Sequence, residues 1–238
     1  MCEILIKINC PHCQSSKVVK NGKKKNGNQN LRCKSCRKQF QPTYQNKGAD
    51  PTIKQLVLRL LERNSGIRDI EELLGVSRKC ILDNICRQGN KIQIQPACPH
   101  YKSVQIDEVW SFVGKRKKGK YWLLYAYSPE TDEILAYSCG SRSAKTVREL
   151  LKKLKEVEID EYCTDQWKAF AQVLPPEKHT IGKAYTKNIE GVNTCIRARN
   201  RRLVRKTTCF SKKKVNHLAA LNLMFNYRNK HKAKHHTF

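Results

Sequence analysis

The 238-residue sequence predicts a multi-domain α+β protein with a small cysteine-rich module, a helical module and a larger mixed α/β domain. Three observations lead to this prediction. Two Cys-x-x-Cys pairs occur near the start, apolar residues then recur at helical spacing, and strand-like segments precede helical ones in the remainder. We expect domains at 1–47, 50–88 and 102–238, with a linker at 89–101. A chain of this length can bury one core of ordinary size beside one or two small modules.

The composition is strongly basic. There are 48 Lys and Arg against 20 Asp and Glu, which gives a formal net charge of +28. Such a charge indicates a polyanionic partner, with nucleic acid as the first candidate and an anionic membrane surface as the second. A hydrophobic content of 39% argues against a disordered polycation, and no segment has the roughly 18 apolar residues that span a bilayer. We therefore expect a cytoplasmic protein whose twelve cysteines are metal ligands or free thiols.

The positive charge is concentrated toward the C-terminal end. Glu190 is the last acidic residue, and the 48 residues after it include 13 Lys and Arg. Residues 197–206, RARNRRLVRK, also contain the apolar Leu203 and Val204, which favours an ordered, phosphate-facing segment over a solvated charge run. The candidate DNA contacts in this segment are Arg199, Arg201, Arg202, Arg205 and Lys206.

Two cysteine pairs, CPHC at 10–13 and CKSC at 33–36, predict a structural zinc site. The 19 residues between the pairs suit a four-cysteine site, in which two tight turns each direct two thiolates at one ion. A module of about 45 residues has too little core to fold unaided, so zinc supplies the missing stability. The alternative is a set of redox or accidental pairs. The expected ligands of one Zn²⁺ are Cys10, Cys13, Cys33 and Cys36.

The next segment predicts a helix-turn-helix. Asp-Pro-Thr at 50–52 is a helix-start signal, and apolar residues follow at helical spacing. A second helix ends at Gly75, and Ser77 is the candidate N-cap of a third helix, which we expect to read DNA. A three-helix bundle that contacts no DNA is the alternative, but an adjacent zinc module in a basic chain favours DNA binding. The candidate DNA contacts on the third helix are Arg78, Lys79 and Asn84.

The rest of the chain predicts a mixed α/β domain. Residues 101–114, YKSVQIDEVWSFVG, form a strand pattern, and two more strand patterns, YWLLYAY and ILAYSCG, follow after short turns. An amphipathic helix, a short strand that ends near Asp165, and further helices complete the domain. The order strand, strand, strand, helix, strand, helices fits a ribonuclease-H-like domain.

Two adjacent acids, Asp107 and Glu108, interrupt the first of these strands. A buried carboxylate is costly unless it is paired or binds a metal. In this element order, Asp107 comes beside Asp165 at the end of the fourth strand, and a late helix brings Glu190 alongside. Three carboxylates repel one another unless cations hold them, and two Mg²⁺ ions would also suit phosphoryl transfer. Because side chains alternate along a strand, Glu108 points to the opposite face and is expected to have a supporting role.

These segments resemble those of a known family. The stretches IDEVWSFVG, CTDQWKAF, YTKNIEGVNTCIRARNRRLVRKTTCFSK and NHLAALNLMFNYRN resemble the IS-one family of bacterial insertion-sequence transposases, and the N-terminal part resembles the end-binding region of that family. The resemblance implies a catalytic triad of Asp107, Asp165 and Glu190 that holds two Mg²⁺, with Mn²⁺ as a substitute. It also implies that Asn193 and Arg197 belong to the site.

By this resemblance the chain is expected to be a DNA transposase of the DDE type, in a bacterial or archaeal cytoplasm and associated with the nucleoid. Its expected activity is to bind terminal inverted repeats, cleave the ends of the element and join the 3′ hydroxyls to target DNA, as a homodimer or larger oligomer on the DNA. Two other functions stay open. One is a nuclease or resolvase of the same fold that only hydrolyses, and the other is a zinc-dependent DNA-binding regulator without catalysis.

Overall fold

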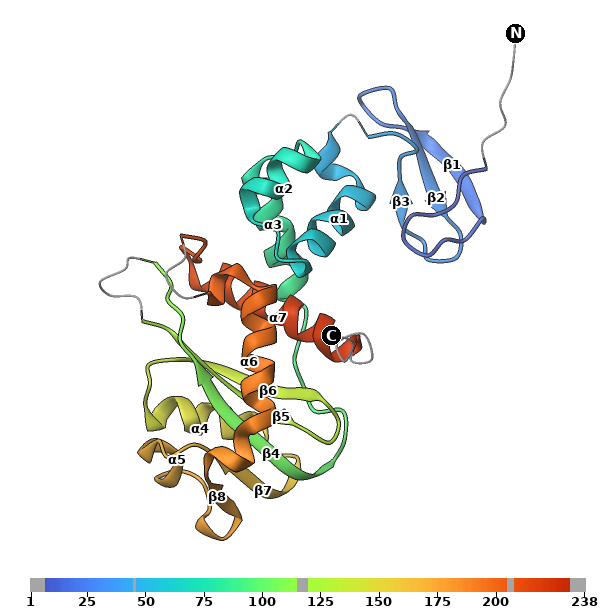
Figure 1. Ribbon diagram of the computed structural model, residues 1–238. Helices are drawn as coiled ribbons and strands as arrows, with labels where there is room; N and C mark the ends of the chain where they lie inside the picture. The colour runs from blue at the N-terminus through green and yellow to red at the C-terminus, as the bar shows by residue number, and fades with distance from the viewer. Residues whose placement is uncertain (1–6, 45, 115–119, 205–207, 232–238) are drawn as a thin grey trace.

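The computed structural model describes residues 7–44, 46–114, 120–204 and 208–231. A β-ribbon, a group of three helices and a mixed α/β domain follow one another along the chain (Figure 1). The predicted order of modules and the mixed α/β class of the largest one are therefore confirmed. None of the helices in the described part of the chain has both the length and the apolar composition that a bilayer span requires.

The N-terminal ribbon is a three-stranded antiparallel sheet. Its strands are β1 (Val18–Lys23), β2 (Gln29–Cys33) and β3 (Gln39–Phe40), with β2 in the middle. The buried apolar side chains of this unit are few: Leu31 and Phe40 pack with two of the four cysteines, Cys10 and Cys33. So small a core gives little hydrophobic stabilisation, which is the situation in which a structural metal ion is needed.

Three short helices follow: α1 (Pro51–Glu62), α2 (Ile67–Leu74) and α3 (Arg78–Gly89), preceded by the 3-10 turn η1 (Lys47–Ala49). The predicted start and stop signals all act as expected. The Asp50 side chain accepts the backbone N–H of Thr52, and the Ser77 side chain accepts that of Cys80. Gly75 ends α2 in the left-handed conformation, with φ of 62°, which glycine adopts without steric cost.

The α/β domain is built on a five-stranded sheet in the order β6-β5-β4-β7-β8. The central strand β4 (His100–Val109) pairs antiparallel with β5 (Trp122–Ser128), which pairs antiparallel with β6 (Glu133–Gly140). On its other side β4 pairs in parallel with β7 (Glu158–Thr164), and the three-residue strand β8 (His179–Ile181) extends that edge. The sequence did not predict β8, because three residues are too few to show an alternating pattern.

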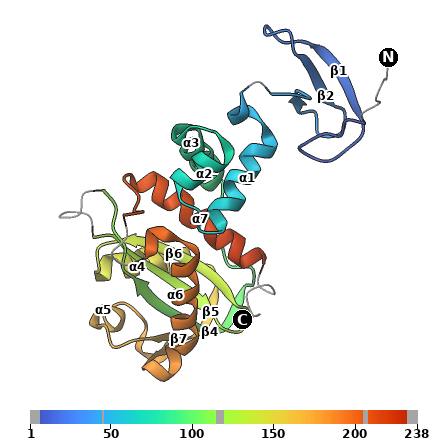
Figure 2. The same ribbon diagram turned by 45° about the horizontal axis from the view of Figure 1, so that its top comes forward.

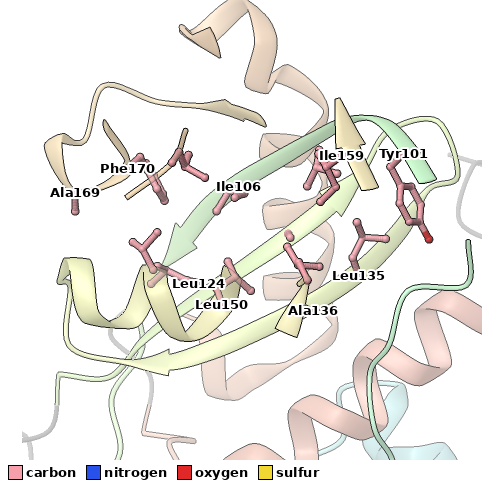
Figure 3. Close-up of a cluster of buried hydrophobic side chains, with 14 residues drawn as sticks. Tyr101, Ile106, Leu124, Leu135, Ala136, Leu150, Ile159, Ala169 and Phe170 are labelled. Atoms are coloured by element: carbon pink, nitrogen blue, oxygen red, sulfur yellow. The ribbon is translucent and has the colours of Figure 1, made fainter. Parts of the chain in front are cut away.

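Helices cover both faces of this sheet. On one face, α4 (Ala144–Lys153) and α5 (Lys168–Ala171) pack over a cluster that includes Ile106, Leu124 and Phe170 (Figure 3). On the other face, α6 (Lys187–Arg199) and α7 (Lys214–Lys230) cover Leu123, Tyr125 and their neighbours. Short 3-10 turns complete the chain: η2 (Pro176–Lys178), η3 (Lys183–Thr186) and η4 (Arg201–Leu203).

The last helix, α7, belongs to two cores at once. Leu221 and Phe225 pack against the sheet, whereas Ala219, Ala220 and Leu223 are buried in the core of the three helices α1–α3. Figures 1 and 2 show α7 lying between the three helices and the sheet. The segment 50–88 is therefore not a self-contained unit, because part of its core comes from more than 120 residues away along the chain.

The contact of α3 with α7 predicts the effect of adding a single methyl group at Gly89. A Cβ there would stand 2.3 Å from the backbone oxygen of Ala219, and a backbone atom cannot move aside as a flexible side chain can. We expect Gly89→Ala to lower the free energy of unfolding by about 1–3 kcal/mol. Urea denaturation followed by circular dichroism measures this free energy of unfolding.

Gly191 in α6 is the matched control. A Cβ at that position meets nothing within 4 Å, so Gly191→Ala should raise the free energy of unfolding by roughly 0.5–1 kcal/mol through helix propensity. Equal effects of the two substitutions would contradict the tight contact between α3 and α7.

Candidate metal and DNA sites

The four predicted zinc ligands come together in the ribbon. Sγ atoms of Cys10 and Cys36 lie 3.6 Å apart, as do those of Cys13 and Cys33, and all four lie within 4.8 Å of one another. Thiolates at about 2.3 Å from a tetrahedral Zn²⁺ stand about 3.8 Å apart, whereas a disulfide requires about 2.0 Å. The geometry therefore fits zinc and excludes disulfides between these sulfurs.

The thiols affect one another's ionisation. Backbone N–H groups, that of Cys36 foremost, lower the pKa of Cys33 to about 6. A hydrogen bond with the Ser15 backbone lowers the pKa of Cys13. Burial and the neighbouring sulfurs together outweigh this effect and raise the pKa of Cys13 to about 12. Close sulfurs cannot all carry a negative charge unless a cation neutralises them, so zinc binding releases protons from this cluster.

A second group of potential ligands lies where β4 and β7 run side by side in parallel. The register aligns Ile106 with Thr164, so Asp107 and Asp165 are the next residues on the two strands. One carboxylate oxygen each from Asp107, Glu108 and Asp165 lie within 4.8 Å of one another. Oxygen ligands at about 2.1 Å from an octahedral ion stand at most about 4.2 Å apart, so small side-chain adjustments let this group hold a hard divalent cation.

Asp107 is held by bonds from two elements. Its Oδ1 accepts the backbone N–H of Glu108 at 2.7 Å, and its Oδ2 accepts the Asn193 amide from α6 at 2.5 Å. The oxygen of Asn193 in turn accepts the hydroxyl of Tyr125, a fully buried residue on β5, at 2.8 Å. This chain of hydrogen bonds fixes the orientation of the Asp107 carboxylate. The sequence indicated Asn193 but not Tyr125, because Tyr125 lies in a strand pattern typical of an ordinary core aromatic.

Glu190 follows Ile189, the residue whose backbone attaches α6 to β4. The backbone N–H of Ile189 donates to the side chain of Gln105, two residues before Asp107 on the same face of β4, at 2.8 Å. Glu190 is exposed and stands outside the group of carboxylates within 4.8 Å. Burial raises the pKa of Asp107, hydrogen bonds from Glu108 and Asn193 oppose this, and the charges of Asp165 and Glu190 add to the rise. Glu190 thus acts electrostatically on Asp107, and its part in a triad stays a prediction.

Glu108 differs from the expectation in its distance from the other acids. It follows Ile106 on the α4 side of the sheet, as strand alternation predicts. Its carboxylate nevertheless joins Asp107 and Asp165, because all three lie at the ends of their strands. Burial raises the pKa of Glu108 to about 7, although the Arg142 guanidinium, which donates to Oε1 at 2.7 Å, opposes the rise.

The third helix presents two of its three predicted DNA contacts to solvent. Arg78 and Lys79 are exposed, and Arg78 also pairs with Glu71 at 2.9 Å. Asn84, by contrast, is buried, and its amide donates to the Lys54 backbone oxygen at 2.8 Å. The prediction for Asn84 is therefore wrong: this side chain joins α3 to α1.

One basic residue of this helix was missed. Arg87 is exposed and, with Lys54 and Lys79, lines a cavity of about 320 Å³ between α3 and the start of α1. Lys79 and Arg87 are eight residues apart, so they lie on one side of the helix, a spacing that the sequence does show.

The arginines after α6 make internal contacts. Arg201 pairs with Asp69 of α2 at 3.2 Å, and the Arg202 side chain donates to Ser211 at 3.1 Å. Arg199 and Arg197 are half-buried at the end of α6, and Arg197 Nε finds no hydrogen-bond partner among the described residues. The predicted contacts Arg205 and Lys206 lie outside the described residues.

Comparisons with known proteins agree on one family. The model for IS1 transposase matches residues 102–232, more than half of the chain, and the model for the InsA N-terminal domain matches residues 5–37. The chain belongs to the IS1 transposase family.

Relatives within this family include insertion-element proteins of bacteria. The InsB protein of insertion element iso-IS1n from Shigella dysenteriae is 43% identical over 108 residues, which cover 45% of this chain and 82% of that protein. The InsB protein of insertion element IS1 4 from Escherichia coli (strain K12) is 32% identical over 120 residues, which cover 50% of this chain and 71% of that protein.

One solved structure that aligns with the chain is a cryo-EM structure of a simian T-cell lymphotropic virus intasome in complex with PP2A regulatory subunit B56 gamma. The alignment has a TM-score of 0.35 and 12% identity, and it covers 75% of this chain and 72% of that chain. A likeness of this size carries no weight for the fold.

Membership of the IS1 transposase family makes this chain a DNA transposase by class. It also confirms the N-terminal zinc ribbon, since the InsA match reaches Cys36, and it supports a divalent cation in the DDE domain. In this family member the InsA-like and InsB-like parts lie on one continuous chain.

The ribbon geometry predicts the result of removing one sulfur ligand. Cys33→Ser should lose stoichiometric zinc and unfold the ribbon, because three thiolates and a small core cannot replace the binding free energy of four. The α/β domain has its own core and should stay folded. Metal analysis of the purified protein and limited proteolysis measure these two outcomes.

Cys163→Ser is the matched control, because Cys163 lies on β7 outside the sulfur cluster. Full zinc content in Cys33→Ser, or loss of zinc in Cys163→Ser, would contradict the assignment of the ligands.

Proposed function

We propose that this chain binds the terminal inverted repeats of its element, cleaves the ends and joins the 3′ hydroxyls to target DNA. The observation that carries the proposal is the position of Asp107 and Asp165 at the carboxyl ends of two adjacent parallel strands, with carboxylate oxygens close enough to share a cation. The zinc ribbon and three helices precede this site along the chain, so one polypeptide contains both a candidate end-binding part and a candidate catalytic part.

The domain architecture supports a ribonuclease-H-like fold. Counted from the first strand of the α/β domain, the sheet order is 3-2-1-4-5, with strands one to three antiparallel and strands four and five parallel to strand one. The element order in the sequence predicts three antiparallel strands and a fourth strand beside the first, and β8 is added at the edge of that arrangement. We propose the ranges 1–47, 50–88 and 102–238 as domains, with the last helix of the third range completing the core of the second.

Asp107, Asp165 and Glu190 are the residues that we propose to hold two Mg²⁺, for which Mn²⁺ can substitute. When bound, such ions activate the attacking oxygen and stabilise the leaving oxygen in an in-line displacement. Asp107 and Asp165 fit hard cations, since they and the neighbouring Glu108 bring carboxylate oxygens within 4.8 Å of one another and Asp107 is desolvated among acids. The Asn193 amide, itself held by the Tyr125 hydroxyl, keeps the Asp107 carboxylate in one orientation.

Basic side chains beside the acids supply the charge that DNA requires. A surface hollow of about 680 Å³ next to Asp165 is lined by Arg142, Trp167, Lys168 and Lys183. Cationic groups at this position can hold the phosphates on either side of the reacting bond, which the carboxylates would otherwise repel. Arg197, on α6 beyond Asn193, is proposed for the same task.

End recognition is proposed for α3 with the ribbon, and we propose that the chain acts as a homodimer or larger oligomer on DNA at the bacterial nucleoid. The exposed residues Lys79 and Arg87 are the strongest candidate phosphate contacts of α3. Arg78, exposed at the first turn, is the candidate for contacts with base edges.

Lys79→Ala tests the DNA-binding face of α3. Removing one lysine that binds a phosphate should weaken binding to all sequences and reduce the slope of log K against log salt by about 1. Fluorescence anisotropy with a labelled terminal repeat, titrated at several salt concentrations, measures both quantities. Lys155→Ala, an exposed lysine after α4, should leave affinity for the repeat unchanged; equal losses in the two variants would remove α3 from end recognition.

The chemistry is tested by neutralising each acid of the triad. Asp107→Asn, Asp165→Asn and Glu190→Gln each keep the size of the side chain but remove a negative ligand. Each should reduce end cleavage and strand transfer by more than about 100-fold while binding to terminal repeats persists. A double variant should lose no more than a single one, because one missing ligand already disables the site.

The matched control is Glu177→Gln, in the turn η2, which lies outside the carboxylate group. A linear DNA that carries both ends, incubated with a target plasmid, separates the functions: cleavage without joining indicates a nuclease or resolvase, and binding without cleavage indicates a regulator. If Glu190→Gln kept full activity, or if Glu177→Gln abolished it, the triad assignment would be wrong.

A further inference from the structure

The Glu108 carboxylate has one oxygen that the protein does not use. Its side chain is only 7% exposed, and Oε2 has no hydrogen-bond partner among the described residues. A buried acceptor without a partner destabilises the fold, and more so when it is charged. An unpartnered polar atom in a well-packed strand therefore indicates a position that a bound group fills.

The other oxygen of Glu108 is fixed. Oε1 accepts Nε of Arg142 at 2.7 Å and also contacts its Nη2. The guanidinium of Arg142 is itself held between two aromatic rings, 4.7 Å from the centroid of Trp167 and 5.3 Å from that of Trp122. Two stacking contacts and two donors leave Arg142 little freedom, so Glu108 is held in one orientation.

Trp167, which stacks on Arg142, also contacts Asp165. The backbone N–H of Trp167 donates to Oδ1 of Asp165 at 3.0 Å, so the residue that stacks on Arg142 also orients an aspartate of the site. Glu108 and Asp165 are therefore positioned by one set of contacts, from β5 and the segments before α4 and α5.

The surroundings identify the missing partner by charge. A carboxylate oxygen of Glu108 lies within 4.8 Å of ligand oxygens from Asp107 and Asp165, so three carboxylates meet where one guanidinium offsets a single charge. A group of acids attracts a cation, and the unpartnered, buried oxygen of Glu108 is a ligand position ready for one.

We propose that Glu108 is a further ligand of the divalent cation at Asp107 and Asp165, and that Arg142 is the positioning residue that holds Glu108 for this task. The proposal rests on the proposed function, since it concerns the same metal site. It assigns to this chain a carboxylate on the α4 side of the sheet, whereas Glu190 approaches from the α6 side.

Binding of Mn²⁺ to the zinc-loaded, DNA-free full chain tests the proposal without reference to activity. Free Mn²⁺ is titrated by electron paramagnetic resonance, and the rise in melting temperature with added Mn²⁺ is measured in parallel. Glu108→Gln should weaken Mn²⁺ binding by at least about 10-fold and remove most of the metal-dependent rise, while the melting temperature without Mn²⁺ stays close to that of the wild type. Glu177→Gln is the matched control and should bind as the wild type does.

Arg142→Gln distinguishes positioning from simple charge. If Arg142 acted only as a positive charge beside the site, its removal would strengthen Mn²⁺ binding. We expect the opposite, a weakening of about threefold or more, because Glu108 loses its orientation. Arg148→Gln, an exposed arginine of α4, is the control and should have no effect.

The outcomes separate this inference from the proposed function. Loss of Mn²⁺ binding in Asp107→Asn but wild-type binding in Glu108→Gln overturns the role of Glu108 alone. Wild-type binding in both variants overturns the metal site itself. If Glu108→Gln fails to fold, Glu108→Asp takes its place. The shorter side chain keeps the charge but moves the carboxylate oxygens away from the cation by one methylene. Wild-type Mn²⁺ binding in Glu108→Asp also overturns the proposal. Stronger binding in Arg142→Gln overturns the positioning role of Arg142.

Discussion

The parallel hydrogen bonding of β4 to β7 sets the position of everything at the candidate active site. Its register places Asp107 and Asp165 at the same edge of the sheet, although 57 residues separate them along the chain. Two neighbouring carboxylates in a partly buried place destabilise each other, so the fold surrounds them with fixed donors. Asn193 and Tyr125 hold Asp107, and the backbone of Trp167 holds Asp165. These donors offset part of the repulsion before any cation binds and give the site a fixed shape.

The helix α7 joins this site to α1–α3, the helices that we propose to bind DNA. One of its faces completes the core over the sheet, and another completes the core of α1–α3, where Gly89 allows the two backbones to touch. A shared core means that the three helices cannot leave the α/β domain without exposing apolar surface. The position of α3 relative to the carboxylates is therefore set by packing and by the pair of Arg201 with Asp69, not by a flexible linker.

The charges are arranged as an acidic centre surrounded by basic residues. A chain with a net charge of +28 places three of its few acids together at one edge of the sheet, with basic residues around them. In the proposed function, the basic residues attract DNA, and the acidic centre repels it unless cations are present. Under that proposal, metal binding and DNA binding at this site are coupled, because contacts of phosphates near Asp165 become favourable when the carboxylates are neutralised.

The sequence by itself determined the local features: the four cysteines at metal-ligand spacing, the helix caps at Asp50 and Ser77, and the aspartate inside a strand. Each depends on residues close together in the chain, where spacing dictates geometry. Only the tertiary structure decided that Asn84 is buried against α1, that Tyr125 supports Asp107 and that α7 is shared between two cores. It alone also brought Glu108 to the site from the opposite face of the sheet. These outcomes depend on which elements pack together, and contacts between distant segments leave no periodic signal in the sequence.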